Sequence, residues 1–293
     1  MSQTIGVVGL GNMGGAMAAN LLAAGFAVVG CDPSPEASGI AARKGVEIAD
    51  TPAEVAKRAS AVILSLPSGA ALDSVVREIG AAPEVRNTIL LEMSTLSLAD
   101  KQAARELLAQ NGNILLDAPV SGTGAQARTG DLVVLASGDR AAFDACLPAL
   151  KAISRRQNYV GEFGAGMQLK LIANHLVTIH NVAAGEAFAL ANKVGLDLQM
   201  VYEVIGDSAG TSRMFQVRGP QMVRGRYDNP TATVRIHLKD LNLIRSFAGD
   251  VGFPLPLFSS AAEHYRLASE AGLDYADTAC VCAVAERLGG LER

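Results

Sequence analysis

A glycine-rich segment near the N-terminus, GLGNMG at residues 9–14, restricts the possible folds of this chain more than any other feature. It follows an apolar run at residues 4–8 and precedes a stretch of helical composition over residues 13–24. A strand that turns into a helix through such glycines is the unit with which parallel α/β sheets bind dinucleotides, and the start of the helix directs N–H groups at the phosphates. The first glycine permits the tight turn, the second lets the backbone approach a pyrophosphate, and the third allows close packing. The predicted cofactor-binding residues of this turn are Gly9, Leu10, Gly11, Asn12, Met13 and Gly14.

An acidic residue after the next strand indicates which dinucleotide would bind. Residues 27–31 predict that strand, and Asp32 stands at its end, 18 residues after Gly14. A carboxylate there would accept hydrogen bonds from the adenosine ribose and repel a 2′-phosphate, which favours NAD without excluding NADP. The alternative is an ordinary turn between strand and helix in which Asp32 caps the loop before Pro33.

The alternation of short β-rich runs with helical stretches up to about residue 160 is typical of a doubly wound, mainly parallel α/β sheet. Further strands are expected at residues 61–66, 88–91, 114–117 and 132–136, and helices at 52–59, 70–79 and 98–110. After Phe163 the pattern becomes helical. Residues 166–194 contain no proline and predict one helix far longer than the usual ~11–12 residues. Shorter helices are expected at 198–205, 237–250, 257–271 and 275–288.

This pattern predicts two domains, an α/β domain over residues 1–163 and an all-α domain over residues 164–293, joined by the long helix. That helix is mostly apolar, so we expect it to assemble a homodimer or homotetramer; burial by its own chain is the alternative. The net charge of −4 and the lack of a basic cluster argue against nucleic-acid or membrane partners. A cytoplasmic location is expected because neither a leader nor an apolar run of about 18 residues is evident.

The cysteines carry no metal-binding or redox motif. The closest pair, Cys280 and Cys282, is spaced as CxC, which fits neither a zinc knuckle nor a CxxC redox site. We expect Cys31, Cys146, Cys280 and Cys282 to be reduced thiols that pack in the interior, and no metal site.

Lys170 lies among apolar neighbours just inside the predicted long helix, an unusual position for a lysine. Asn174 is four residues further on and therefore shares its helical face, a row that Thr178, Asn181 and Gly185 continue. We expect such a polar row on an apolar helix to border a cleft or a partner. Apolar surroundings disfavour the charged amine, so one lysine could accept and return a proton. The alternative is a lysine whose stem covers apolar surface while its charge reaches solvent.

A second polar segment, at residues 117–132, follows a predicted strand and contains a serine and a threonine among glycines. Such a loop exposes several backbone N–H groups to one small volume, which suits a carboxylate ligand. A flexible turn is the alternative, because the same residues are common turn formers.

Four segments in order are similar to four sequence blocks of the β-hydroxyacid dehydrogenase family, typified by 3-hydroxyisobutyrate dehydrogenase. They are GLGNMG, DAPVSG at 117–122, GAGMQLK at 164–170 with Asn174, and IHLKDL at 236–241. The resemblance covers nearly the whole chain. It implies an N-terminal Rossmann domain, an all-helical C-terminal domain, an active site in the cleft between them and a dimer or tetramer.

The resemblance also implies individual roles. Lys170 matches the catalytic lysine and Asn174 the substrate-binding asparagine, whereas Lys239 matches a residue that closes over nicotinamide and substrate, with Asp240 interpreted as its support. The loop expected to hold the substrate carboxylate comprises Ser121, Gly122 and Thr123, and the further cofactor contacts comprise Leu66, Pro67 and Thr95. Strand-terminating turns are the alternative for Pro67 and Thr95, and a solvated helix position for Lys239.

Two departures from the family pattern are expected to matter. Thr123 stands where the family commonly has glycine, which places a hydroxyl and a methyl group where they would tune the substrate pocket. The family commonly has two successive asparagines near the lysine, whereas here Ala173 and His175 flank Asn174. A residue turns by about 100° along a helix, so His175 points away from the Lys170 face and is interpreted as structural.

The resemblance implies hydride transfer from a short β-hydroxy acid to NAD, with Lys170 removing the hydroxyl proton. The candidate substrates are 3-hydroxyisobutyrate, hydroxy acids related to tartronate semialdehyde, serine-like acids and four-carbon sugar acids such as threonate. A semialdehyde reductase of the tartronate or succinic semialdehyde type, or an imine reductase, using NADPH is the alternative. The imine alternative is disfavoured because imine reductases generally replace the lysine. A module that only binds nucleotides, or a shortened relative of 6-phosphogluconate dehydrogenase, fits less well.

Overall fold

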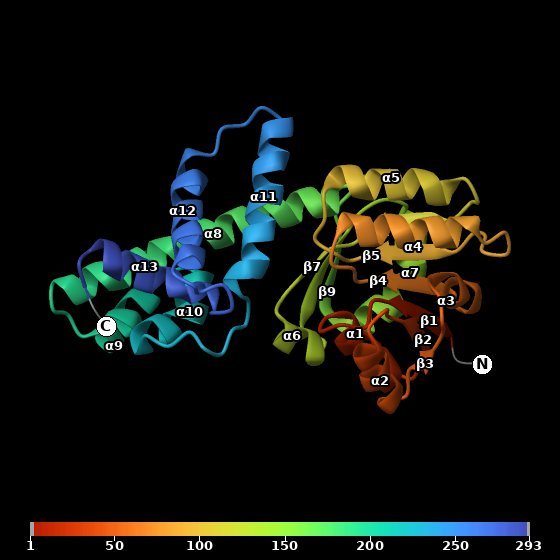
Figure 1. Ribbon diagram of the computed structural model, residues 1–293, viewed down its shortest axis with the longest axis horizontal. Coiled ribbons are helices and arrows are strands. Elements are labelled where there is room, and N and C mark those ends of the chain that lie inside the picture. The colour runs from red at the N-terminus through yellow and green to blue at the C-terminus, as the bar shows by residue number, and fades with distance from the viewer. Residues whose placement is uncertain (1–2, 292–293) are drawn as a thin grey trace. The chain divides into compact units, whose positions relative to one another are not determined.

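The computed structural model describes residues 3–291 and divides the chain into two compact units, residues 1–170 and 171–293 (Figure 1). The helix α8 (Ala165–Lys193) begins in the first unit and continues in the second. The domain boundary expected after Phe163 stays a prediction, because one continuous helix belongs to both units.

A six-stranded parallel sheet organises the first unit, in the order β3-β2-β1-β4-β5-β6. Its strands are β1 (Thr4–Val8), β2 (Ala27–Cys31), β3 (Glu47–Ile48), β4 (Ala61–Leu64), β5 (Ile89–Glu92) and β6 (Ile114–Asp117). The strand order reverses beside β1, which pairs with both β2 and β4. In parallel α/β sheets, ligands bind at the carboxyl ends of the strands where the order reverses. The predicted doubly wound class is confirmed.

Helices cover both faces of this sheet, which is why its strands other than the short, exposed β3 are mainly apolar. One core lies beneath α1 and α7 and includes Met17 and Phe143; the other lies beneath α3, α4 and α5 and includes Leu72 and Leu108. Figure 1 shows α4 and α5 side by side over the sheet. The helices of this unit are α1 (Gly14–Ala23), α2 (Pro35–Arg43), α3 (Pro52–Arg58), α4 (Gly69–Ala81), α5 (Leu98–Ala109), α6 (Gly124–Arg128) and α7 (Arg140–Ile153).

A second, three-stranded sheet follows β6. It consists of β7 (Val120–Ser121), β8 (Leu132–Ala136) and β9 (Ser154–Tyr159), with β7 antiparallel and β9 parallel to β8. Residues 132–136 therefore form a strand as expected, although in this separate sheet. The sequence of β9, SRRQNY, has no apolar alternation because much of the strand is exposed, so it was not predicted.

The second unit is helical, as predicted. After α8 it contains α9 (Leu198–Gly206), α10 (Arg213–Arg224), α11 (Val234–Asp250), α12 (Pro256–Glu270), a 3-10 turn η1 (Thr278–Cys280) and α13 (Val281–Leu288). Gly185 lies where α8 meets the start of α13, because a Cβ there would come within 3.0 Å of the Cys282 nitrogen. All four cysteines are buried and free, which confirms the expected packing thiols.

Among the described residues no helix combines the length and hydropathy that a membrane span requires.

Candidate active site

The glycine-rich turn sits at the carboxyl end of β1, and two of its glycines are required by backbone packing. Gly9 has φ +90°, and a Cβ there would lie 2.2 Å from the Ser65 carbonyl oxygen. A Cβ on Gly14 would lie 1.8 Å from the Gly9 carbonyl oxygen. At Gly11 an added Cβ would meet nothing within 4 Å, so the middle of the turn faces open space. No acidic residue occupies the first turn of α1, and no side chain caps it. These features fit a dinucleotide pyrophosphate.

Asp32 lies between this turn and the start of α2. Its Oδ2 accepts a hydrogen bond from the Leu10 nitrogen at 2.7 Å, and its Oδ1 accepts one from the Ser34 nitrogen at 2.8 Å. Each carboxylate oxygen has a second lone pair with which it could accept from a ribose hydroxyl. The bond to Ser34 also fits the alternative in which Asp32 caps the loop.

The loops after β4 and β5 border the same end of the sheet. The Leu66 nitrogen donates to Ser94 Oγ at 2.8 Å, which ties the two loops together. Pro67 and Thr95 follow directly in these loops. The predicted cofactor residues of the first unit therefore lie at the carboxyl ends of β1, β2, β4 and β5.

The predicted carboxylate loop follows β7. Gly122 has φ +145°, and a Cβ there would come within 2.7 Å of Leu132, so only glycine fits. Thr123 caps α6: its Oγ1 accepts from the Gln126 nitrogen at 3.3 Å, and its own nitrogen donates to Gln126 Oε1 at 3.0 Å. The hydroxyl expected to tune the substrate pocket thus takes part in a capping box. A direct contact of Thr123 with substrate stays a prediction.

The carboxylate loop and the glycine-rich turn are in contact. A Cβ on Gly124 would come within 2.4 Å of Asn12 Nδ2, and Arg128 donates to Asn12 Oδ1 at 3.3 Å. Asn20 on α1 donates to the Ala127 carbonyl oxygen at 2.7 Å. This packing holds α6 beside the predicted phosphate site.

Lys170 and Asn174 lie one turn apart on α8, and each side chain is only 9% exposed. Asn174 Nδ2 donates to Asp240 Oδ2 on α11 at 3.0 Å, which leaves the amide oxygen as an acceptor for another group. Asp240 Oδ1 is 3.8 Å from the Lys239 ammonium. Asp240 therefore contacts Lys239, as interpreted from the sequence, and also orients Asn174, which the sequence did not reveal.

The rest of the polar row on α8 belongs to the interior of the second unit. Thr178 and Asn181 are fully buried. Thr178 Oγ1 donates to the Asn174 carbonyl oxygen at 2.8 Å, and Asn181 donates to Tyr265 Oη at 3.0 Å. The expectation that the whole row borders a cleft or a partner is therefore wrong for these two residues, because the helical core supplies their hydrogen-bond partners.

Comparisons with known proteins show the family of this chain. Residues 4–192 match the family model described as the NAD binding domain of 6-phosphogluconate dehydrogenase, and residues 164–285 match the one described as NAD-binding of NADP-dependent 3-hydroxyisobutyrate dehydrogenase. The chain is 35% identical over 281 residues to L-threonate dehydrogenase of Pectobacterium atrosepticum, covering 94% of this chain and 92% of the relative. The β-hydroxyacid dehydrogenase family is where this chain belongs.

Two more relatives match this chain over nearly its whole length. A probable 3-hydroxyisobutyrate dehydrogenase of Mycobacterium bovis is 32% identical over 280 residues, with 93% of this chain and 95% of the relative covered. The solved structure of Mycobacterium tuberculosis 3-hydroxyisobutyrate dehydrogenase with L-serine has a TM-score of 0.90 at 31% identity, covering 97% of this chain and 99% of that one. The chain is an NAD(P)-dependent hydroxyacid dehydrogenase.

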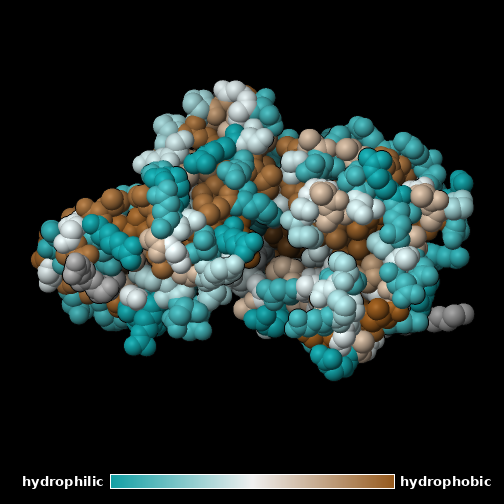
Figure 2. Space-filling view, viewed as in Figure 1, coloured by the Kyte–Doolittle hydropathy of each residue, from teal (hydrophilic) through white to brown (hydrophobic). Residues whose placement is uncertain are grey.

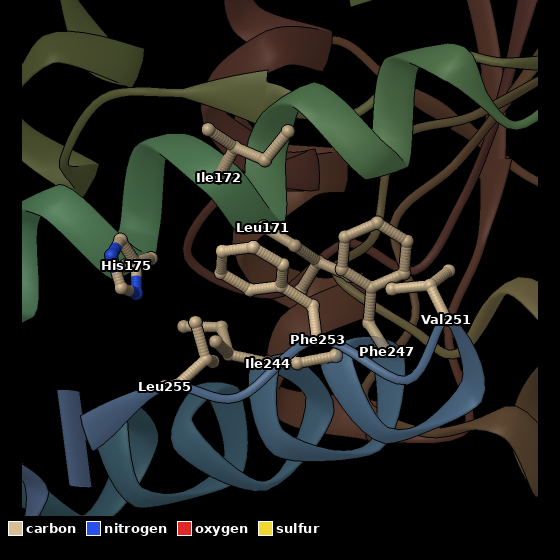
Figure 3. Close-up of a pocket in the computed structure, with 9 residues that line it drawn as sticks. Leu171, Ile172, His175, Ile244, Phe247, Val251, Phe253 and Leu255 are labelled. Carbon is tan, nitrogen blue, oxygen red and sulfur yellow. The ribbon is translucent and has the colours of Figure 1, made fainter.

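His175 lies away from the Lys170 face of this dehydrogenase, as expected. His175 lines an apolar pocket of about 320 Å³ that lies between α8 on one side and α11 and the loop after it on the other (Figure 3). Its ring stacks on the Phe258 ring, with 5.5 Å between the ring centroids. Burial, with a smaller contribution from His180, lowers the pKa of His175. Neither Lys170 nor Asn174 lines the pocket, which supports the structural interpretation of His175.

Three contacts at the carboxylate loop and at the Lys170–Asn174 face were not predicted from the sequence. They are those of Gln126 with Thr123, of Arg128 with Asn12 and of Asp240 with Asn174. The T-x-x-Q spacing of a capping box at residues 123–126 was a usable signal for Gln126. The Arg128 and Asp240 contacts join residues 116 and 66 positions apart, so no local pattern reveals them.

Proposed function

We propose that this dehydrogenase oxidises a short hydroxy acid with NAD, and that Lys170 is its general acid–base. The observation that carries the proposal is the nearly buried pair on one face of α8, Lys170 and Asn174, with the amide oriented by Asp240. A nearly buried amine beside a fixed amide suits proton exchange with a bound hydroxyl.

In the oxidative direction, the neutral Lys170 amine takes the proton of the substrate hydroxyl as the carbon–oxygen double bond forms. Asn174 orients the reacting oxygen through its amide, and Ser121, Gly122 and Thr123 hold the carboxylate. The nicotinamide, when bound, accepts the hydride from the carbinol carbon. The products are a carbonyl acid, the reduced cofactor and protonated Lys170, which balances the step.

NAD is the proposed cofactor because of the charge around Asp32. Residues 33–37, PSPEA, contain no lysine or arginine to pair with a 2′-phosphate, and Glu36 adds a second carboxylate. A 2′-phosphate would therefore meet repulsion without compensation. The fit of the glycine-rich turn to a pyrophosphate holds for either cofactor.

We propose a four-carbon sugar acid, with L-threonate first, as the substrate, since L-threonate dehydrogenase is the name of relatives that span almost the whole chain. 3-Hydroxyisobutyrate is the second candidate, on the name of another such relative. Semialdehyde reduction would run the same chemistry in reverse. Imine reduction has less support, because Lys170 is retained.

The purified chain is tested by following NADH absorbance with L-threonate, 3-hydroxyisobutyrate, tartronate semialdehyde and a cyclic imine, each with both cofactors. We expect the highest kcat/KM with L-threonate and NAD, and NMR of the product should show a new carbonyl. Turnover of the imine alone, with no hydroxy acid oxidised by either cofactor, would contradict the proposal.

The cellular setting and assembly follow from the same proposal. We place the enzyme in the cytoplasm, where NAD and small hydroxy acids are available. We propose a homodimer or homotetramer through apolar side chains on α8, where Leu169, Ile172 and Leu176 are 40%, 51% and 47% exposed. Figure 2 shows brown areas among the teal side chains of the helical unit.

A further inference from the structure

Three fully buried charged side chains meet at the carboxyl ends of β5 and β6. Glu92 and Asp117 are paired in register as the last residues of these strands, and Lys101 reaches them from α5. The Lys101 ammonium is 2.7 Å from Glu92 Oε2 and 2.7 Å from Asp117 Oδ1. Burial alone would lower the pKa of Lys101, but the two carboxylates outweigh it and raise the pKa above its ordinary value.

Asp117 also contacts the start of α8, the helix that carries Lys170. Its Oδ2 accepts from the Met167 nitrogen at 2.7 Å and from Ser137 Oγ at 3.1 Å, and Ser137 Oγ accepts from the Gly166 nitrogen at 3.0 Å. A Cβ on Gly166 would lie 2.2 Å from the Leu135 carbonyl oxygen, so the helix start is seated closely on β8. A carboxylate at this end complements the positive pole of the helix.

Glu92 faces the other way, toward the predicted cofactor loops. Its Oε1 accepts from the Ser94 nitrogen at 2.9 Å, and Ser94 Oγ accepts from the Leu66 nitrogen at 2.8 Å. A continuous series of polar contacts therefore runs from the loop after β4, through Ser94, Glu92, Lys101 and Asp117, to Met167. Met167 is three residues, less than one helical turn, before Lys170.

Stability alone does not explain this arrangement. Well-packed apolar residues commonly replace buried ion pairs with no loss of stability, because three charges must be taken out of water. What apolar packing cannot supply is a directional bond to the first N–H groups of α8.

We propose that Glu92, Lys101 and Asp117 form a positioning network that fixes the start of α8, and with it Lys170, relative to the loops that hold the nicotinamide cofactor. None of the three is proposed to touch the reacting atoms. The inference rests on the proposed function, because it takes Lys170 as the proton acceptor.

The main test is Asp117→Asn, which keeps the side-chain shape but removes the charge that pairs with Lys101. We expect kcat to fall about 10- to 100-fold, because Lys170 would no longer be aligned with the substrate. The Kd for NADH should change less than about twofold. The kinetic isotope effect with substrate deuterated at the carbinol carbon should also change. The matched control is Asn113→Ala at the amino end of β6, which removes buried hydrogen bonds to Thr88 and Val85. It should lower Tm without changing kcat or the isotope effect.

If Asp117→Asn does not fold, Ser137→Ala decides the question, because it removes only the hydroxyl that bridges Asp117 and Gly166. We then expect kcat to fall about 3- to 10-fold at unchanged NADH affinity. A folded variant whose Tm falls while kcat and the isotope effect stay at the wild-type values would overturn the inference. Wild-type protein that oxidises no hydroxy acid would instead contradict the proposed function, so the two failures are distinguishable.

Discussion

Asp32 is the residue on which the proposed preference for NAD depends. Its carboxylate is held by the Leu10 and Ser34 nitrogens at the end of β2, where an adenosine ribose would lie. The acid thus keeps a fixed position, and residues 33–37, which follow it, contain no lysine or arginine to offset a 2′-phosphate. The same contacts mean that its replacement also loosens the glycine-rich turn, so affinity and stability must be measured together.

Asp32→Ser should lower the ratio of kcat/KM for NAD to that for NADP by about 10- to 100-fold, because a charged hydrogen-bond acceptor and its repulsion of phosphate are lost together. Steady-state kinetics with both cofactors measures this ratio. Glu106→Gln is the control, since it removes an equal charge from an exposed position on α5. An unchanged ratio in Asp32→Ser would remove this residue from cofactor choice.

Residues with a steric or local requirement were predictable from the sequence, whereas distant polar partners were not. Gly9 and Gly14 are needed because backbone oxygens occupy the space of a Cβ, a requirement that leaves a recognisable motif. The bond from Asn174 to Asp240 spans 66 positions, and the contact of Lys101 with Asp117 spans 16 positions across two elements. Such contacts exist only after the chain has folded.

At the scale of elements, the η1 turn is held to the helical unit by one buried carboxylate. Asp277 is fully buried, pairs with Arg218 of α10, and accepts from the Thr231 nitrogen at 2.7 Å and the Ala279 nitrogen at 2.9 Å. Burial alone would raise the pKa of Asp277, but Arg218 and these N–H groups outweigh it and lower the pKa.

Asp277→Asn should lower the free energy of unfolding by about 3–5 kcal/mol at neutral pH, because Arg218 becomes an unpaired buried charge. A carboxyl with a lowered folded-state pKa stabilises the fold above its unfolded-state pKa of about 3.9, and this contribution is lost as pH falls through the folded-state value. The difference in the free energy of unfolding between Asp277→Asn and wild type should therefore shrink below about pH 4. Urea unfolding followed by circular dichroism at both pH values measures it.

The exposed N-cap variant Asp197→Asn is the control and should cost less than about 1 kcal/mol, because asparagine also caps helices. Equal stability of Asp277→Asn and wild type at neutral pH would show that the ion pair contributes nothing.

Most elements with strong hydrophobic patterns were predicted, although the amphipathic helix α7 was missed, and elements without such a pattern were missed as well. The five buried strands β1, β2, β4, β5 and β6 and the long helix α8 have such patterns. The strand β3 has only two residues, and α10 contains an internal proline and three arginines, so neither had a clear signal. Their positions depend on pairing with β2 and packing on α9.

For the whole molecule, the exposed apolar side chains of α8 are the observation that supports the proposed homo-oligomer. Leu176 is 47% exposed although it belongs to the long apolar helix. Apolar side chains that recur at helical spacing are more often covered by another subunit than left in water. The sequence suggested assembly through the composition of this helix, but it could not separate the side chains buried by the chain itself from those left exposed.

Sedimentation velocity of the wild-type chain at micromolar concentration should give a dimer or tetramer, and Leu176→Glu should shift it toward monomer because a charge would be buried at the interface. Ile40→Glu, a matched change at a 41% exposed position on α2, should leave the assembly unchanged. A wild-type monomer over the whole concentration range would contradict the proposed assembly.

Lys170→Met, with turnover and NADH binding measured on the same preparation, shows whether Lys170 exchanges the proton while the hydride is transferred. We expect kcat to fall about 10²- to 10⁴-fold with NADH affinity within about twofold of wild type, because the proton acceptor is lost while the cofactor site is kept. The exposed neighbour variant Gln168→Met should keep wild-type turnover. Turnover of Lys170→Met close to the wild-type value would rule out Lys170 as the general acid–base.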